Sequence, residues 1–252
     1  MELESSERAL IRTAIQRYFN AGDTGSSAEL RQGFHPGAMM FWVLDDGVLQ
    51  SRSQSQWCKI LDEAASPVRA VRRQIHWIDS SGGMAVASLL SQFSQYQFQD
   101  YVLLARMGAR WQIVAKVFQR IEGGSTVVTT DDRRPEILEL LARVLRARDS
   151  YDADLLGQSC HIRSTRLEVE EGQLVCVALP EWQARWREQR IAGEVNTATR
   201  SIVRLESGGA AAVAELVHDH GDSALTEYAL LLRIEGAWQI MALTCASPGR
   251  LE

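Results

Sequence analysis

An internal repeat is the feature that most constrains what this chain can fold into. Residues 100–115 return 127 positions later as residues 227–242, and 8 of the 16 aligned positions are identical. A repeat of this length has the size of a whole small domain rather than of a solenoid unit. The sequence therefore predicts two tandem domains, residues 1–122 and 133–252. A linker rich in Gly, Ser, Thr and Asp joins them over residues 122–132.

Composition limits the classes of partner. The net charge of −5 and the isoelectric point near 5.6 argue against a nucleic-acid partner, because nucleic-acid-binding surfaces are basic. No apolar run is long enough to span a bilayer, so we expect no membrane partner. The four cysteines form no CxxC pair and predict free thiols in a reducing compartment. Together with an acidic amino-terminal sequence that is unlike a secretory signal, these features predict a cytoplasmic protein.

Each copy follows the same order of predicted elements. Apolar residues at helical spacing occur over residues 10–19 and again over 137–145. A brief second helix is expected to end at His35 in one copy and at His161 in the other. An apolar strand follows, at 39–44 in the first copy, then a hairpin, a tryptophan-bearing helix and a run of strands. Early helices and late antiparallel strands predict an α+β fold, with about three helices packed on a curved sheet in each domain.

Several short motifs of the first copy carry a family resemblance: Tyr18-Phe19-Asn20, Phe34-His35-Pro36, Asp100-Tyr101 and the run from Trp111 to Phe118. Their order and spacing resemble the putative lumazine-binding family. That family belongs to the nuclear transport factor 2-like superfamily, also called SnoaL-like or ketosteroid-isomerase-like. The second copy keeps His161, Glu227-Tyr228 and Trp238-Gln239-Ile240.

The resemblance implies two cone-shaped domains, each with a sheet wrapped around an apolar pocket. Because members of the superfamily commonly dimerise through their sheets, the two copies are expected to form an intramolecular pseudo-dimer, and the chain to be a monomer. The superfamily includes isomerases, dehydratases, cyclases and epoxide hydrolases that need no cofactor. We therefore expect a protein that binds a small apolar metabolite and performs general acid–base chemistry on it. The alternative is a non-catalytic ligand-binding or protein-docking module. An acid and a base that face one cavity would distinguish the two.

Asp100 is the first candidate catalytic residue. Aspartate is disfavoured inside strands, yet the second copy keeps an acid at the same place, Glu227. The alternative is a carboxylate that faces solvent or braces a loop. Strand alternation places Asp100 on the face of Val102 and Leu104, opposite Tyr101, but both faces are apolar and the pattern does not say which lines a pocket.

Two histidines are further catalytic candidates. His35 precedes the first strand and recurs as His161, so a structural role at a helix end is the favoured alternative to a pocket base. His76 lies in an otherwise apolar strand and is replaced by Val203 in the second copy, which favours a functional role.

Four residues are candidate ligand-binding groups: Tyr18, Trp42, Tyr101 and Lys116. A phenol such as that of Tyr18 can donate to a ligand oxygen, although core tyrosines are common. Lys116 alternates with apolar residues and could stabilise an oxyanion, or extend from the rim of the sheet to solvent. Trp42 would line an aromatic cavity or simply fill the core.

No metal site or cofactor is expected. His218-Asp219-His220 places two imidazoles on one strand face, but no third ligand follows from the spacing, and a solvated hairpin end is favoured. No phosphate-binding glycine motif occurs.

The two copies differ at the candidate polar positions. The second copy has Val144, Val203 and Leu243 where the first has Tyr18, His76 and Lys116. This asymmetry predicts that the functional pocket lies in the first copy, with Asp100 as its most consequential polar residue. Asp100→Asn is then expected to abolish turnover with little loss of fold.

Overall fold

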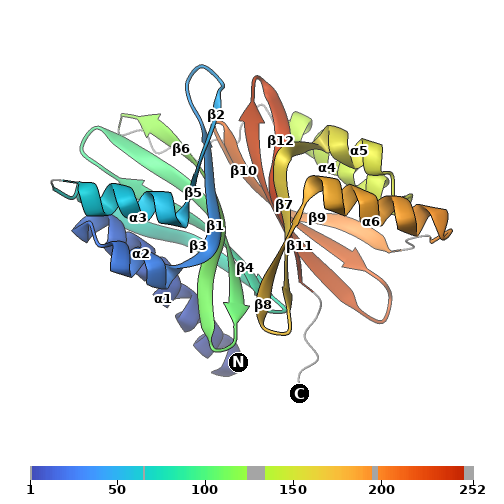
Figure 1. The fold of residues 1–252 in the computed structure, drawn as a ribbon, viewed down its shortest axis with the longest axis horizontal. Coiled ribbons are helices and arrows are strands. Elements are labelled where there is room, and N and C mark those ends of the chain that lie inside the picture. Colours follow the sequence, from blue (N-terminus) through green and yellow to red (C-terminus); the bar gives the residue numbers. More distant parts are fainter. Residues whose placement is uncertain (1, 65, 124–133, 195–197, 247–252) are drawn as a thin grey trace.

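The computed structural model describes residues 2–64, 66–123, 134–194 and 198–246, so most of the predicted linker lies outside the described residues. Two halves stand side by side, with their helices on the outer sides and their sheets facing each other (Figure 1). No helix in the described ranges is long and apolar enough to cross a membrane.

Within its described residues, the first half contains three helices and a six-stranded sheet with the strand order β2-β1-β6-β5-β4-β3. Its helices are α1 (Glu2–Thr24), α2 (Ser27–Gly33) and α3 (Gln54–Glu63). Its strands are β1 (Phe34–Val43), β2 (Leu49–Ser53), β3 (Arg72–Ser81), β4 (Met84–Gln92), β5 (Tyr96–Met107) and β6 (Arg110–Glu122).

The second half repeats this arrangement with the order β8-β7-β12-β11-β10-β9. Its helices are α4 (Arg134–Asp149), α5 (Ala153–Ser159) and α6 (Leu179–Ile191). Its strands are β7 (Cys160–Glu170), β8 (Gln173–Ala178), β9 (Thr199–Gly208), β10 (Ala211–Asp219), β11 (Ala224–Ile234) and β12 (Ala237–Ala246). The predicted α+β class and mostly antiparallel sheets are confirmed, since the parallel pairs in the described sheets are β1 with β6 and β7 with β12.

Local chemistry sets several element boundaries. Ser53 and Gln56 form a capping box that starts α3, because each side chain accepts the backbone N–H of the other. Both residues of the turn between β7 and β8, Glu171 and Gly172, have positive φ, as a type I′ turn requires.

The first strand begins earlier than predicted. β1 starts at Phe34 and not at Met39, so His35 lies within a strand rather than at a helix end. The pairing of β1 with β6 shifts register between Phe34 and Met39, where Pro36 and Gly37 interrupt the apolar pattern. This irregularity conceals the beginning of the strand in the sequence.

The two faces of each sheet have different partners. In the first half, Val102 and Leu104 pack with the helices in one core cluster. Tyr101 and Leu103 point the other way and pack with residues of the second half, including Tyr228 and Leu230. The predicted contact through the sheets is therefore confirmed, and it forms a core of its own between the halves.

Polar contacts mark the edge of this inter-domain core. Glu206 of β9 accepts a hydrogen bond from Trp77 Nε1 at 2.5 Å and another from Ser88 Oγ at 2.6 Å. Both donors belong to the first half.

The reciprocal contacts are made by Asp79, the first-half equivalent of Glu206. Its carboxylate lies 3.6 Å from Arg204, and Arg204 lies 3.5 Å from Glu215. Arg204 and Glu215 are the second-half equivalents of the Glu206 partners, Trp77 and Ser88. Reciprocal contacts of this kind indicate approximate two-fold symmetry between the halves.

Candidate functional site

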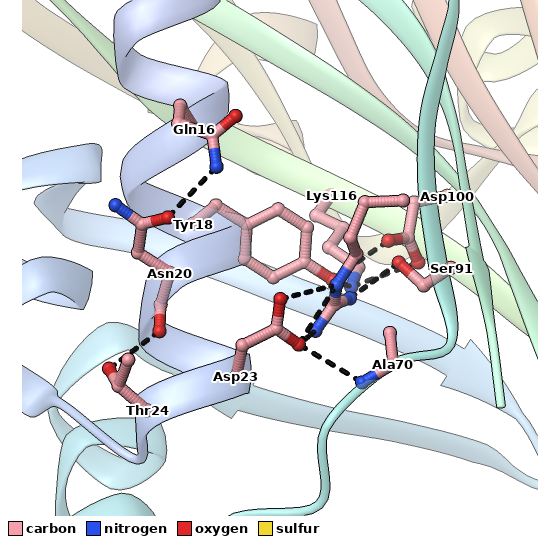
Figure 2. A network of polar contacts seen from close by, with 10 residues as sticks. Gln16, Tyr18, Asn20, Asp23, Thr24, Ala70, Ser91, Asp100 and Lys116 are labelled. Atoms are coloured by element: carbon pink, nitrogen blue, oxygen red, sulfur yellow. Dashed lines mark hydrogen bonds and ion pairs between the residues drawn. The ribbon is translucent and has the colours of Figure 1, made fainter.

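Three buried polar side chains meet beneath the helices of the first domain. Tyr18 of α1 donates a hydrogen bond to Asp100 Oδ2 at 2.7 Å, and Lys116 of β6 donates to Tyr18 Oη at 2.5 Å. Lys116 Nζ also lies 3.0 Å from Asp100 Oδ1, as an ion pair rather than a well-directed hydrogen bond. Figure 2 shows Tyr18 reaching from the helix toward both partners on the sheet.

Burial changes the acid–base behaviour of this network. Burial, reinforced by the charge of Asp100 and the hydrogen bond to it, raises the pKa of Tyr18 well above its ordinary value. Tyr18 is therefore a neutral phenol at physiological pH. Burial also lowers the pKa of Lys116, while the Asp100 carboxylate opposes this change. Asp100 itself is fully buried behind the other two groups.

A second ion pair adjoins this network and was not predicted. Arg73 of β3 binds Asp23 at 2.7 Å and donates to Ser91 Oγ at 2.6 Å. In Figure 2, Asp23 lies beside the Tyr18 ring at the end of α1. The pair could have been inferred from the repeat, because the second copy has Asp149 and Arg200 at the equivalent positions. These two residues also form an ion pair.

A cavity of about 250 Å³ opens above the network. Its floor includes Tyr18 and Lys116, and Arg73 is the other charged residue among its described wall residues. The rest of the wall is mostly aromatic or apolar: Trp57, Leu61, Pro67, Val68, Phe93, Tyr96, Phe98 and Phe118. Among the described residues that line it there is no carboxylate and no histidine, so the predicted acid and base do not face the cavity together.

Two predicted ligand-binding residues lie outside this wall. Trp42 stacks on Phe118, its partner on the neighbouring strand, with ring centroids 5.2 Å apart, and so supports a wall residue from beside it. Tyr101 is on the opposite face of the sheet, where burial and the nearby Glu206 raise its pKa. Its position follows from strand alternation, because adjacent residues of a strand point to opposite faces.

The two histidine candidates are also separate from the network. His35 Nδ1 accepts the backbone N–H of Gly37 at 3.1 Å, and His161 makes the same bond with Arg163. This shared contact supports the bulged start of the strand. His76 occupies an irregularity in β3 between Ile75 and Trp77, and its side chain forms no hydrogen bond or ion pair with described residues.

The second domain has a buried polar network of its own, which the sequence comparison missed. Glu227 lies 2.6 Å from Arg148 of α4 and 2.8 Å from His218 Nε2 of β10. Leu243 stands where the first copy has the strand lysine, Lys116. Arg148 supplies a cation from the helix instead, at a position where the first copy has Gly22. His218 is buried rather than solvated as predicted, because it contacts Glu227. Arg148 and His218 together lower the pKa of Glu227 despite its burial.

Comparisons with known proteins agree with the repeat. The model of a family described as putative lumazine-binding matches the chain twice, over residues 6–119 and 132–244. An NTF2-like protein of unknown function from Shewanella baltica OS155 is 23% identical, with 46% of this chain and 94% of that chain covered and a TM-score of 0.43. One from Silicibacter pomeroyi DSS-3 is 18% identical, with 46% and 97% covered and a TM-score of 0.40. An NTF2-like superfamily protein from Salmonella enterica is 16% identical, with 49% and 96% covered and a TM-score of 0.38. No relative was found among curated proteins.

Proposed function

We propose that this chain, which belongs to the putative lumazine-binding family in both of its halves, binds a small, flat and largely apolar molecule in its first domain. The observation that carries the proposal is an aromatic cavity with two polar groups, Tyr18 and Lys116, at its floor. Apolar walls with a few convergent polar groups are typical of small-molecule sites. The volume of about 250 Å³ corresponds to roughly eight water molecules and suits one or two fused rings.

The floor indicates which chemical group the ligand carries. A lysine ammonium has three N–H donors, and within the described chain Lys116 has two polar partners, Tyr18 Oη and Asp100 Oδ1. The remaining donor can bind a carbonyl or similar oxygen. Asp100 then acts as a positioning residue, because it fixes both groups that contact the ligand without reaching the cavity itself.

A second candidate function is catalysis at the same floor. Lys116 and the Tyr18 hydroxyl could stabilise negative charge that develops on a ligand oxygen, as in an isomerase or dehydratase. The described wall offers no carboxylate or histidine to take a proton, and this favours binding without chemistry as the first proposal.

Calorimetric titration of the full chain tests the binding proposal. Lumazine serves as a bicyclic probe with carbonyl oxygens, and naphthalene as a probe with two fused rings and no oxygen. The paired variant Asp100→Asn/Lys116→Met removes the ammonium without leaving a buried lone charge. We expect lumazine affinity to fall about tenfold or more, the loss of one charge-assisted hydrogen bond, while naphthalene affinity stays the same.

The control variant Lys59→Met removes an exposed lysine of α3 and should change neither affinity. Equal losses for both probes in the paired variant would contradict the role of Lys116. A wild-type protein that binds neither probe would contradict a site for flat bicyclic ligands.

A further inference from the structure

The second domain has a cavity at the place equivalent to the first one. It measures about 180 Å³, and its wall includes Arg148, Trp186, His220 and Leu225. The first-domain equivalents of these four residues, which all line the first cavity, are Gly22, Leu61, Phe93 and Phe98. The repeat has thus kept the position of the cavity and changed its chemistry from aromatic to basic.

Two arginines carry most of the positive charge. Arg148 is almost fully buried, and Arg166 of β7 takes the position of the buried Met40 in the first domain. Arg166 also lines an adjoining cavity of about 470 Å³, which shares Trp186 and Gln189 with the smaller one. The described wall of the smaller cavity contains no carboxylate.

Each arginine is only partly satisfied within the protein. Arg148 pairs with Glu227, but its Nε is buried without a hydrogen-bond acceptor among the described residues. Arg166 pairs with Glu168, whose side chain keeps some exposure. A buried donor without an acceptor is unfavourable, and a bound anion that reached it would stabilise it.

His218, which also lines the cavity, bridges an arginine and a carboxylate. Arg200 donates from Nε to His218 Nδ1 at 3.1 Å, so Nδ1 carries no proton. His218 Nε2–H therefore donates to Glu227 at 2.8 Å. Glu227 already compensates Arg148, and Glu168 already compensates Arg166. A ligand with two negative charges would therefore be repelled more strongly than a ligand with one.

We propose that the second domain binds a small organic monocarboxylate with an aromatic body. The guanidinium groups of Arg148 and Arg166 hold the carboxylate, because their planar donor pairs match its two oxygens. Tyr151 and Trp186, whose rings meet edge to face at 6.0 Å, cover the apolar part. This site is independent of the one proposed in the first domain, so either can fail without the other.

Calorimetry with benzoate on the full chain tests this site, with benzamide as the uncharged probe of the same shape. Benzoate should bind and benzamide should bind at least tenfold more weakly. Arg166→Gln should weaken benzoate about tenfold or more, the value of a charge-assisted contact. Glu168→Gln should strengthen it several-fold, because it frees Arg166. A variant that unfolds can only bind more weakly, so a gain in affinity in Glu168→Gln cannot result from a loss of fold. Lys59→Gln, a charge loss on α3 of the first domain, should leave benzoate binding unchanged.

Three outcomes would overturn the proposal. The first is no benzoate binding up to ~10 mM, a concentration that fills even a millimolar site. The second is benzoate affinity that changes in neither Arg166→Gln nor Glu168→Gln. The third is tighter binding of inorganic phosphate than of benzoate, which would indicate a phosphate site instead.

Discussion

Asp100→Asn is the substitution that most directly probes the buried network of the first domain. The change keeps the shape of the side chain and removes its charge. Asn has one oxygen that accepts hydrogen bonds, whereas Asp100 offers oxygens to both Tyr18 and Lys116. One of these two donors therefore loses its acceptor, and the lysine ammonium loses its counter-ion although its side chain is almost fully buried.

The expected loss of stability is about 3–5 kcal/mol, the cost of leaving one partner of a buried ion pair uncompensated. That loss is a large share of the ~5–15 kcal/mol that stabilises typical domains. The sequence alone suggested little loss of fold for this variant, and the buried pair with Lys116 changes that expectation. The pKa of Lys116, already lowered by burial, should fall further in the variant. Since the unfolded chain then binds a proton that the folded chain lacks, the stability of the variant should rise with pH above the lowered pKa.

A double-mutant cycle measured by urea unfolding isolates the pair. The variants are Asp100→Asn, Lys116→Met and the two combined. We expect the double variant to be more stable than the sum of the single losses implies, by about 1–3 kcal/mol, because it leaves no lone buried charge. The exposed pair Lys59 and Glu63 is the matched control, with an expected coupling below ~0.5 kcal/mol.

Additive losses at Asp100 and Lys116, within about 0.5 kcal/mol, would refute the reasoning. They would mean that the two groups do not interact as a buried ion pair in solution.

The inter-domain face should respond to pH, because burial and the nearby Asp79 raise the pKa of Glu215. The folded state holds this proton more tightly than the unfolded state, so the stabilisation is lost as pH rises. Urea unfolding from about pH 4 to 7 should therefore show the stability of the wild type falling relative to that of Glu215→Gln. Parallel stability curves for the two proteins would contradict this. Glu206→Ala should cost about 1–3 kcal/mol in the same assay, because Trp77 Nε1 and Ser88 Oγ lose their acceptor, and unchanged stability would count against that contact. Light scattering should give the mass of one chain, 28.1 kDa, since the second domain already covers the sheet of the first; a dimer that forms through the same sheet faces would argue against the pseudo-dimer.

The architecture followed from the sequence because it depends on patterns within each copy. The repeat over 100–115 and 227–242 predicted two domains, and their elements predicted α+β halves. Strand alternation correctly separated Asp100 from Tyr101, because neighbouring residues of a strand must point to opposite faces. The recurring acid, Asp100 in one copy and Glu227 in the other, lies within the buried polar network of each domain.

The partners of those acids were decided only by tertiary structure. Tyr18 and Asp100 lie 82 positions apart, and helix packing on the sheet brings them together. In the second domain, Arg148 of a helix takes the place of the strand lysine as the partner of the acid. Aligning the two copies position by position shows only that the lysine has become Leu243, and so suggests that the cation is lost. A buried carboxylate requires a positive partner, but any element that reaches it can supply one, because the requirement concerns distance and burial rather than position in the chain.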